Sequence, residues 1–307
     1  MYCKYFVFAS HEYFFPLHSL PLAWYTGRRF TRYPYTLVAR SPCLEELKYE
    51  HGSYWTGPVR IAFMARTLTS LTFYTRLVSI VVRGSAQAKR GPYGTPEWCN
   101  DSFATLRALE AAGVKFEITG TDSFKAVEGP CVFISNHMST LETFILPTII
   151  APFKDATFVV KQSLIDYPIF RHIMRSRNPI TVGRTNPRED LKAVLEGGAE
   201  RLKAGMSIIL FPQTTRTPVF DPEQFNTIGI KLAKKAGVPV VPIALKTNAW
   251  GNGTFLKDYG KIDPSKKVHF AFGKPLLIKG RGTEEHQEII EFISGKLKEW
   301  EAEEQAR

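Results

Sequence analysis

Short apolar segments alternate with amphipathic segments of helical length between residues 100 and 300, and this alternation constrains the fold more than any other feature. Such an order predicts an α/β domain with a mostly parallel central sheet flanked by helices. The functional loops of such a sheet lie at the carboxyl ends of its strands. Strands are expected at residues 114–118, 131–134, 157–160, 179–182, 207–211, 238–245 and 268–272, and helices at 101–112, 139–150, 162–175, 190–203, 225–236 and from 283 onward.

Positive charge is concentrated toward the N-terminus. The 307 residues include 40 Lys+Arg and 29 Asp+Glu, a net charge of +11. The first 100 residues hold 12 Lys+Arg and 5 Glu, so they carry +7 of that charge, and they also hold 20 of the 39 aromatic residues. A basic chain favours polyanionic partners, which include nucleic acid, anionic membranes and phosphorylated or CoA-type substrates. Basic and aromatic residues together are typical of membrane-interface segments and of single-strand nucleic-acid platforms.

The chain divides into three predicted regions. Residues 1–57 are aromatic and interrupted by prolines, and we treat them as an extension without an assigned function. Residues 58–96 are expected to hold an amphipathic helix over 58–83 and then a Gly/Pro/Lys-rich linker, and residues 97–307 hold the main domain. The helix fits either a surface helix packed on the domain or an in-plane membrane helix. Its apolar face consists of Met64, Leu71, Tyr74, Val78, Val81 and Val82, opposite Arg66, Arg76 and Arg83.

Several classes of site lack their sequence signatures. The four cysteines (Cys3, Cys43, Cys99 and Cys131) are far apart, so neither a structural zinc site nor a disulfide framework is expected, which fits a reducing compartment. The chain contains no GxSxG, GxxxxGK[ST] or HExxH motif. No stretch of 18 uncharged apolar residues is present, so a simple membrane-spanning helix is not expected.

A histidine and a carboxylate follow the apolar segment 131–134, at His137 and Glu142. On one continuous helix an offset of five turns two side chains about 140° apart. The pair therefore meets only if His137 lies in the loop after the strand and Glu142 lies in the first helical turn. In that arrangement the carboxylate accepts from one imidazole nitrogen and leaves the other free as a general base. Ser139 and Glu142 also have the spacing of a capping box, so a purely structural interpretation stays open.

Cations follow three further predicted strands. Arg216 lies in the segment Phe211-Pro-Gln-Thr-Thr-Arg216, Arg184 follows the strand at 179–182, and Lys161 ends the strand at 157–160. Each alone is typical of a solvated loop. Together, on the sheet edge that also carries His137, they predict a cationic pocket beside a general base.

These segments resemble the lysophospholipid and glycerol-phosphate acyltransferase family, typified by lysophosphatidic acid acyltransferases. Order and spacing match over roughly residues 100–280. The family has Asp where this chain has Glu142, and Glu-Gly where it has Gln213-Thr214. The matching segments are Asn136-His137 with Glu142, Gly183-Arg184, Phe211-Pro-Gln-Thr-Thr-Arg216 and Val238-Pro-Val-Val-Pro242.

The resemblance implies an O-acyltransferase that moves a fatty acyl group from acyl-CoA or acyl-carrier protein to a lysophospholipid such as 1-acyl-sn-glycerol-3-phosphate. It implies no cofactor and no metal, and a place on the cytoplasmic face of an anionic membrane. His137 would be the base and Glu142 its orienting carboxylate. The implied substrate-binding residues are Arg216, Thr214, Thr215, Gln213, Arg184 and Lys161.

The sequence leaves three points open. The departures at Glu142 and Gln213-Thr214 leave the acceptor open, and they allow a catalytically impaired lipid-binding relative. A basic nucleic-acid-binding protein is the alternative from another class, although no nucleic-acid motif is present. The oligomeric state is also open.

Overall fold

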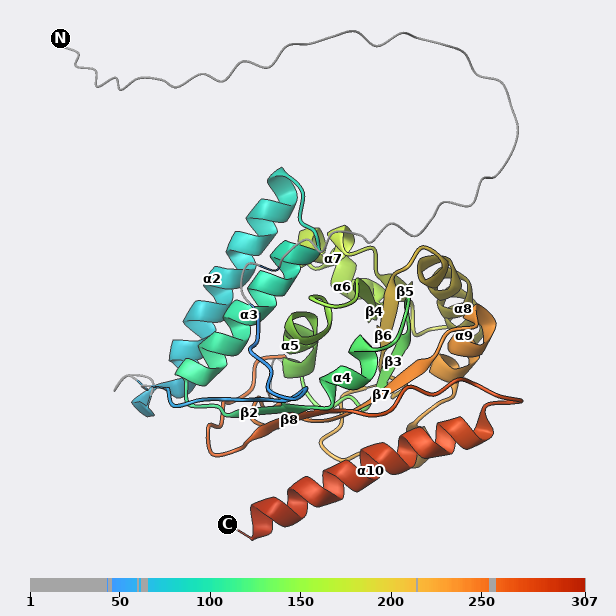
Figure 1. The fold of residues 1–307 in the computed structure, drawn as a ribbon. Coiled ribbons are helices and arrows are strands. Elements are labelled where there is room, and N and C mark those ends of the chain that lie inside the picture. Colours follow the sequence, from blue (N-terminus) through green and yellow to red (C-terminus); the bar gives the residue numbers. More distant parts are fainter. Residues whose placement is uncertain are drawn as a thin grey trace, which may run out of the picture. The chain divides into compact units, whose positions relative to one another are not determined.

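One eight-stranded sheet forms the centre of the protein in the computed structural model, which describes residues 43, 46–59, 61, 66–213, 215–253 and 258–306 (Figure 1). The strands lie in the order β1-β2-β8-β7-β3-β6-β4-β5. The extension predicted at 1–57 falls mostly outside the described residues. The strands are β1 Tyr54–Trp55, β2 Phe116–Thr119, β3 Val132–Ser135, β4 Ala156–Lys161, β5 Ile180–Val182, β6 Ser207–Leu210, β7 Val240–Lys246 and β8 Val268–Phe272.

The sheet is mixed but mostly parallel, so the predicted α/β fold class is confirmed. Strands β7, β3, β6, β4 and β5 run in the same direction. Strand β8 is antiparallel to β7, β2 is parallel to β8, and β1 is antiparallel to β2. The carboxyl ends of the five parallel neighbours therefore meet at one edge of the sheet. The predicted histidine and cations follow four of those five strands.

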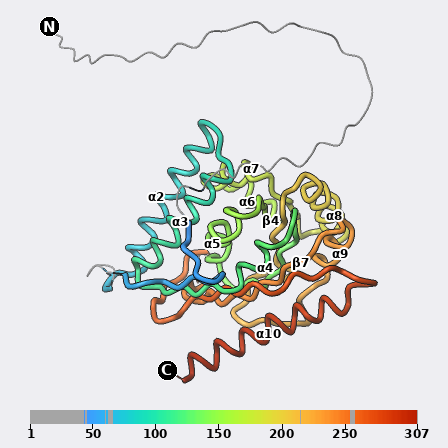
Figure 2. Tube along the Cα trace, in the orientation of Figure 1, coloured from blue at the N-terminus to red at the C-terminus, as the bar shows by residue number. Residues whose placement is uncertain are grey.

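Helices cover both faces of the sheet (Figures 1 and 2). Helices α2, α3, α5 and α7 contact one another on one side, while α8 and α9 pack together on the other and α10 lies along β7. The predicted helix at 162–175 is divided into α6 and α7 around Pro168, because proline cannot continue a helical hydrogen-bond ladder. The helices are α2 Thr69–Arg90, α3 Thr95–Ala111, α4 Thr121–Lys125, α5 Leu141–Ile150, α6 Gln162–Asp166, α7 Arg171–Ser176, α8 Pro187–Lys203, α9 Ile228–Ala236 and α10 Thr283–Gln305, with a 3-10 turn at Pro222–Gln224.

Helix α2 differs from the predicted N-terminal helix in both its limits and its packing. It continues through Gly84 to Arg90, so most of the predicted linker is helical. Gly84 is buried, and a Cβ there would lie 2.3 Å from an oxygen of Asp101 in α3. This glycine therefore allows close helix packing instead of marking a linker. Within the described residues, no helix is both long enough and apolar enough to cross a bilayer.

A disulfide joins Cys43 to Cys99, in α3, with their Cα atoms 6.0 Å apart. The expectation that cysteines play no cross-linking part is wrong for this pair. Sequence spacing gives no signal because 56 residues separate the two and only the fold brings them together. Cys131 is a free, buried thiol, and burial raises its pKa to about 12.

Reduction should destabilise the protein by breaking the Cys43–Cys99 bond. A loop of this length corresponds to at most about 4 kcal/mol of unfolded-state entropy. Dithiothreitol should therefore lower the melting temperature of the wild type and leave that of the Cys43→Ser/Cys99→Ser variant unchanged. Equal melting temperatures of the wild type with and without the reductant would contradict the bond.

Candidate active site

The loop after β3 is fixed by the side chain of its first residue. Asn136 Nδ2 donates to the Leu245 carbonyl (2.8 Å), and Asn136 Oδ1 accepts from the Leu245 N–H (3.0 Å). Both bonds are buried and tie the end of β3 to β7. The backbone therefore leaves the sheet at a defined point, directly before His137.

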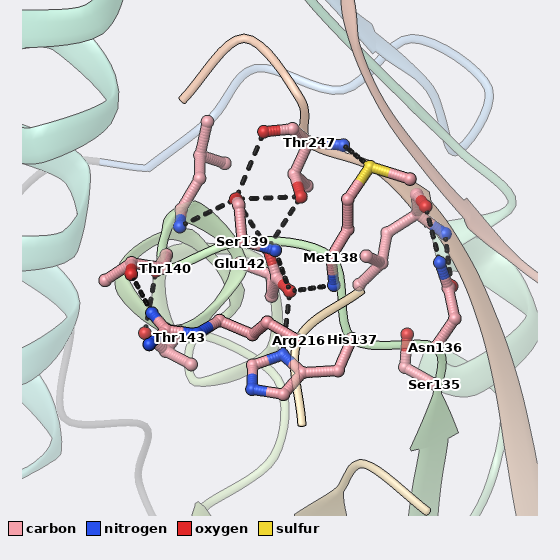
Figure 3. Close-up of polar contacts among 12 residues, drawn as sticks. Ser135, Asn136, His137, Met138, Ser139, Thr140, Glu142, Thr143, Arg216 and Thr247 are labelled. Carbon is pink, nitrogen blue, oxygen red and sulfur yellow. Dashed lines mark hydrogen bonds and ion pairs between the residues drawn. The ribbon is translucent and has the colours of Figure 1, made fainter. Parts of the chain in front are cut away.

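His137 and Glu142 meet in the arrangement that the offset of five required. His137 lies in the loop, and Glu142 is in the first turn of α5. His137 Nδ1 is 2.8 Å from Glu142 Oε1 (Figure 3). The other ring nitrogen points away from the carboxylate (Figure 3). One face of the ring stacks on Phe211, with centroids 4.2 Å apart and planes 15° apart. The imidazole is therefore held by its edge and by one face.

Glu142 is fully buried and accepts from several other donors (Figure 3). The Met138 N–H (2.7 Å) and the Ser139 N–H (2.9 Å) donate to Oε1, and the Thr247 hydroxyl lies 2.7 Å from Oε2. Burial alone would raise the pKa of this carboxyl, but His137, Thr247 and the Ser139 N–H lower it below its usual value. The carboxylate is therefore held in its charged form. The structural and the histidine-orienting interpretations of Glu142 both describe real contacts.

Arg216 lies beside this pair (Figure 3). Its Nη1 donates to the hydroxyl of Thr140, and its Nη2 is 2.5 Å from Asp258 Oδ1. The Arg216 side chain is 22% exposed, so it forms part of a surface that a solute can reach.

Gln213 was predicted in the substrate pocket, but in the structure it is buried and holds the backbone of His137. Its side chain is buried, its Oε1 accepts from the His137 N–H (2.9 Å), and its Nε2 donates to the Thr217 hydroxyl (2.8 Å). The Thr217 N–H donates back to the His137 carbonyl (3.0 Å). An amide both accepts and donates here, whereas the carboxylate of the family motif only accepts. The replacement of the motif's Glu by Gln213 therefore affects the buried support of the His137 backbone.

The remaining predicted residues lie farther along the same edge. Lys161 ends β4 and Arg184 follows β5, and both are exposed. Neither makes a hydrogen bond or ion pair with His137 or Arg216 in the part of the chain that the structure describes. With neighbouring strands about 4.8 Å apart, β4 and β5 lie roughly 10 and 14 Å from β3. Thr215 is exposed, and Thr214 falls outside the described residues.

Three further residues contact the site, and the sequence did not predict their contacts: Thr247, Phe211 and Asp258. Phe211 begins the motif that ends at Arg216, so only its stacking on His137 was not predicted. Thr247 and Asp258 are 105 residues or more from their partners Glu142 and Thr140, and no local pattern connects them.

The chain is similar to known acyltransferases. Residues 115–246 match the family model described as Acyltransferase. A 1-acyl-sn-glycerol-3-phosphate acyltransferase of Pseudomonas aeruginosa is 37% identical over 147 residues, which are 48% of this chain and 54% of that protein. A chloroplastic 1-acyl-sn-glycerol-3-phosphate acyltransferase of Brassica napus is 30% identical over 131 residues, 43% of this chain and 37% of that protein. The match thus spans about half or less of these relatives.

The fold also has a solved counterpart. The crystal structure of the 1-acyl-sn-glycerophosphate (LPA) acyltransferase PlsC from Thermotoga maritima superposes with a TM-score of 0.56 and 20% identity, covering 78% of this chain and 97% of that one. The predicted resemblance is confirmed, because residues 115–246 match the Acyltransferase family model. The domain match includes His137, Glu142 and Arg216 and ends directly before Thr247.

Thr247 should stabilise the fold through Glu142. Thr247→Val removes one hydrogen bond to a buried carboxylate, so we expect the free energy of unfolding to fall by roughly 1.5–3 kcal/mol. Thr148→Val is the matched control, because Thr148 is equally buried and its hydroxyl has no hydrogen-bond partner among the described residues. Urea unfolding of both variants checks this. Equal effects of the two substitutions would show that the hydroxyl of Thr247 contributes nothing to the carboxylate.

Proposed function

We propose that this protein is a 1-acyl-sn-glycerol-3-phosphate O-acyltransferase, which esterifies a lysophospholipid in phospholipid biosynthesis or remodelling. The observation that carries the proposal is the His137–Glu142 pair, with one imidazole nitrogen held by a buried carboxylate and the other directed away from it. Arg216 beside the pair gives a cation for a phosphate-bearing acceptor. The named relatives of Pseudomonas aeruginosa and Brassica napus support the same substrate class.

The proposed reaction is a direct transfer. Glu142 accepts the Nδ1–H of His137, so Nε2 is unprotonated and takes the proton of the acceptor hydroxyl. The hydroxyl oxygen forms a bond to the thioester carbonyl carbon, the carbon–sulfur bond breaks, and the thiolate leaves. The imidazolium of His137 returns its proton to that thiolate. Glu142 stabilises the imidazolium because its own charge is buried and fixed.

The donor in this proposal is acyl-CoA or acyl-carrier protein, used as a co-substrate without a further cofactor. A thioester is already activated toward attack by a hydroxyl. Arg216 would hold the acceptor phosphate, helped by Thr214 and Thr215. Lys161 and Arg184, two and three strands away from β3, would extend the positive field along the same edge.

Replacing His137 should nearly abolish transfer while the protein stays folded. A positioned general base contributes about 10²–10⁴-fold, so His137→Ala should lose at least that factor in kcat. The fold should survive because Glu142 keeps its bonds to Met138, Ser139 and Thr247. A panel assay crossing labelled acyl-CoA and acyl-carrier protein with lysophosphatidic acid, glycerol-3-phosphate and other lysolipids measures the effect.

His286→Ala is the matched control, because His286 lies on α10 and stacks on Phe225. Its activity should equal that of the wild type. Undiminished turnover in His137→Ala would reject the base. A folded wild type that binds lysolipid but transfers nothing in any donor–acceptor pair would instead identify an impaired lipid-binding relative.

We further propose that α2 docks the protein on an anionic membrane at the cytoplasmic face. The predicted apolar face is divided in the structure. Val81 packs inward, whereas Leu71, Val78 and Val82 are each more than half exposed. Arg76, Arg83 and Arg90 are exposed as well, and at about 100° per residue they form a second stripe on one side of the apolar one. An exposed apolar stripe beside a basic one is typical of in-plane membrane helices.

Removing the stripe should weaken binding to vesicles without unfolding the protein. Leu71→Ser/Val78→Ser is expected to reduce co-sedimentation with anionic liposomes, because both side chains lie in solvent. Leu277→Ser is the control, since Leu277 is 65% exposed beyond β8. Arg66→Glu/Arg76→Glu should release the protein from anionic but not neutral vesicles, because each near-surface cation contributes about 1 kcal/mol.

Arg83 is left unchanged in this experiment because it pairs with Asp101 at 3.0 Å. Sedimentation of all variants like the wild type would exclude docking through α2. Retention on a polynucleotide column that exceeds liposome binding would favour the nucleic-acid alternative.

A further inference from the structure

The guanidinium assigned to the acceptor phosphate already carries an anion from the protein itself. Arg216 Nη2 is 2.5 Å from Asp258 Oδ1, and the Thr140 hydroxyl, which accepts from Arg216 Nη1, lies 3.4 Å from the same oxygen. A phosphate that binds Arg216 with both nitrogens must therefore take the place of this carboxylate.

Hydrogen bonds to the neighbouring structure hold the backbone of Asp258 and of the residues that follow it. Its carbonyl accepts from Nε1 of Trp250, a buried residue in the loop after β7 (3.1 Å). Two residues later, the Gly260 carbonyl accepts from the Tyr74 hydroxyl (2.5 Å). The Ile262 N–H donates to Ser70 Oγ (3.0 Å). Since Ser70 and Tyr74 belong to α2, the loop that carries Asp258 is attached to that helix.

The pair is asymmetric toward solvent. The Asp258 side chain is 51% exposed, against 22% for Arg216, so the carboxylate lies on the outer side of the guanidinium. Exposed ion pairs contribute little because both charges are hydrated and screened. The carboxylate can therefore move into water at small cost when a dianionic phosphate with two parallel hydrogen bonds to Arg216 replaces it.

We propose that Asp258 is a specificity-determining residue, which occupies Arg216 until the phosphate of the acceptor displaces it. The inference rests on the proposed function, because it concerns how Arg216 binds the acceptor phosphate. Asp258 raises the KM for phosphate acceptors and lowers the affinity of Arg216 for weaker anions. It also takes over Arg216 when the product phosphate leaves. Asp258 lies beyond the family match, which ends at residue 246.

The test compares Asp258→Asn, Arg216→Ala and the double variant. Asparagine keeps the shape and the polar contact with Thr140 but removes the competing charge. We expect the KM for lysophosphatidic acid and its dissociation constant, measured by calorimetry with a short-chain form, to fall by up to about fivefold in Asp258→Asn. Arg216→Ala should raise both constants, and Asp258→Asn should have no further effect in that background.

Asp122→Asn is the matched control. Asp122 is exposed and ion-paired with Lys125 on α4, after β2 and so at the opposite edge of the sheet, and its variant should bind like the wild type. Unchanged or weaker binding in Asp258→Asn, with Arg216→Ala still impaired, would overturn the proposal. The binding measurement needs no turnover, so it stays decisive even if the proposed transfer fails. Binding unaffected by either variant would reject both Asp258 and Arg216 as acceptor-phosphate residues.

Discussion

A single buried carboxylate holds the candidate site together. Glu142 has no exposure, and a charge in such a place is tolerated only when nearly all its acceptor positions are filled. The donors come from the loop after β3, from the imidazole of His137, and from Thr247 at the end of β7. The need to satisfy one charge therefore fixes the start of α5, the end of β7 and the plane of His137 relative to one another.

The sequence predicted the parts of the fold that depend on local hydrophobic patterns. It did not predict the parts that depend on which strands or helices pack together. Apolar segments of strand length placed β3, β6 and β7 close to their observed limits. Their periodicity carries no information about direction, so the reversal of β8 and β2 relative to the rest was not foreseen. The extent of α2 was missed because Gly84 was interpreted as a linker residue, whereas its missing side chain allows α3 to approach.

The site shows the same division. His137 and Glu142 are five residues apart, so helix geometry alone stated the condition for their contact, and the structure meets it. Gln213 was placed in the pocket because it belongs to the same motif as Arg216, three residues earlier, yet the fold buries its side chain against the His137 N–H. Thr247 reaches Glu142 across 105 residues, and Asp258 lies 118 residues from Thr140 and 42 from Arg216, so these contacts become visible only in the folded structure.

Helix α2 connects its own exposed apolar stripe to the site around Arg216, two features that the sequence did not link. Ser70 and Tyr74 hold the loop of Asp258, while Leu71 and Val78 of the same helix turn toward solvent. A rigid helix keeps these two faces at a constant distance and angle. The apolar stripe proposed to meet the bilayer and the carboxylate on Arg216 are thus parts of one connected unit. In the proposed reaction, a lysolipid whose chain stays in the membrane presents its phosphate at a defined height, and this connection would hold Asp258 and its partner Arg216 at a fixed distance from the bilayer.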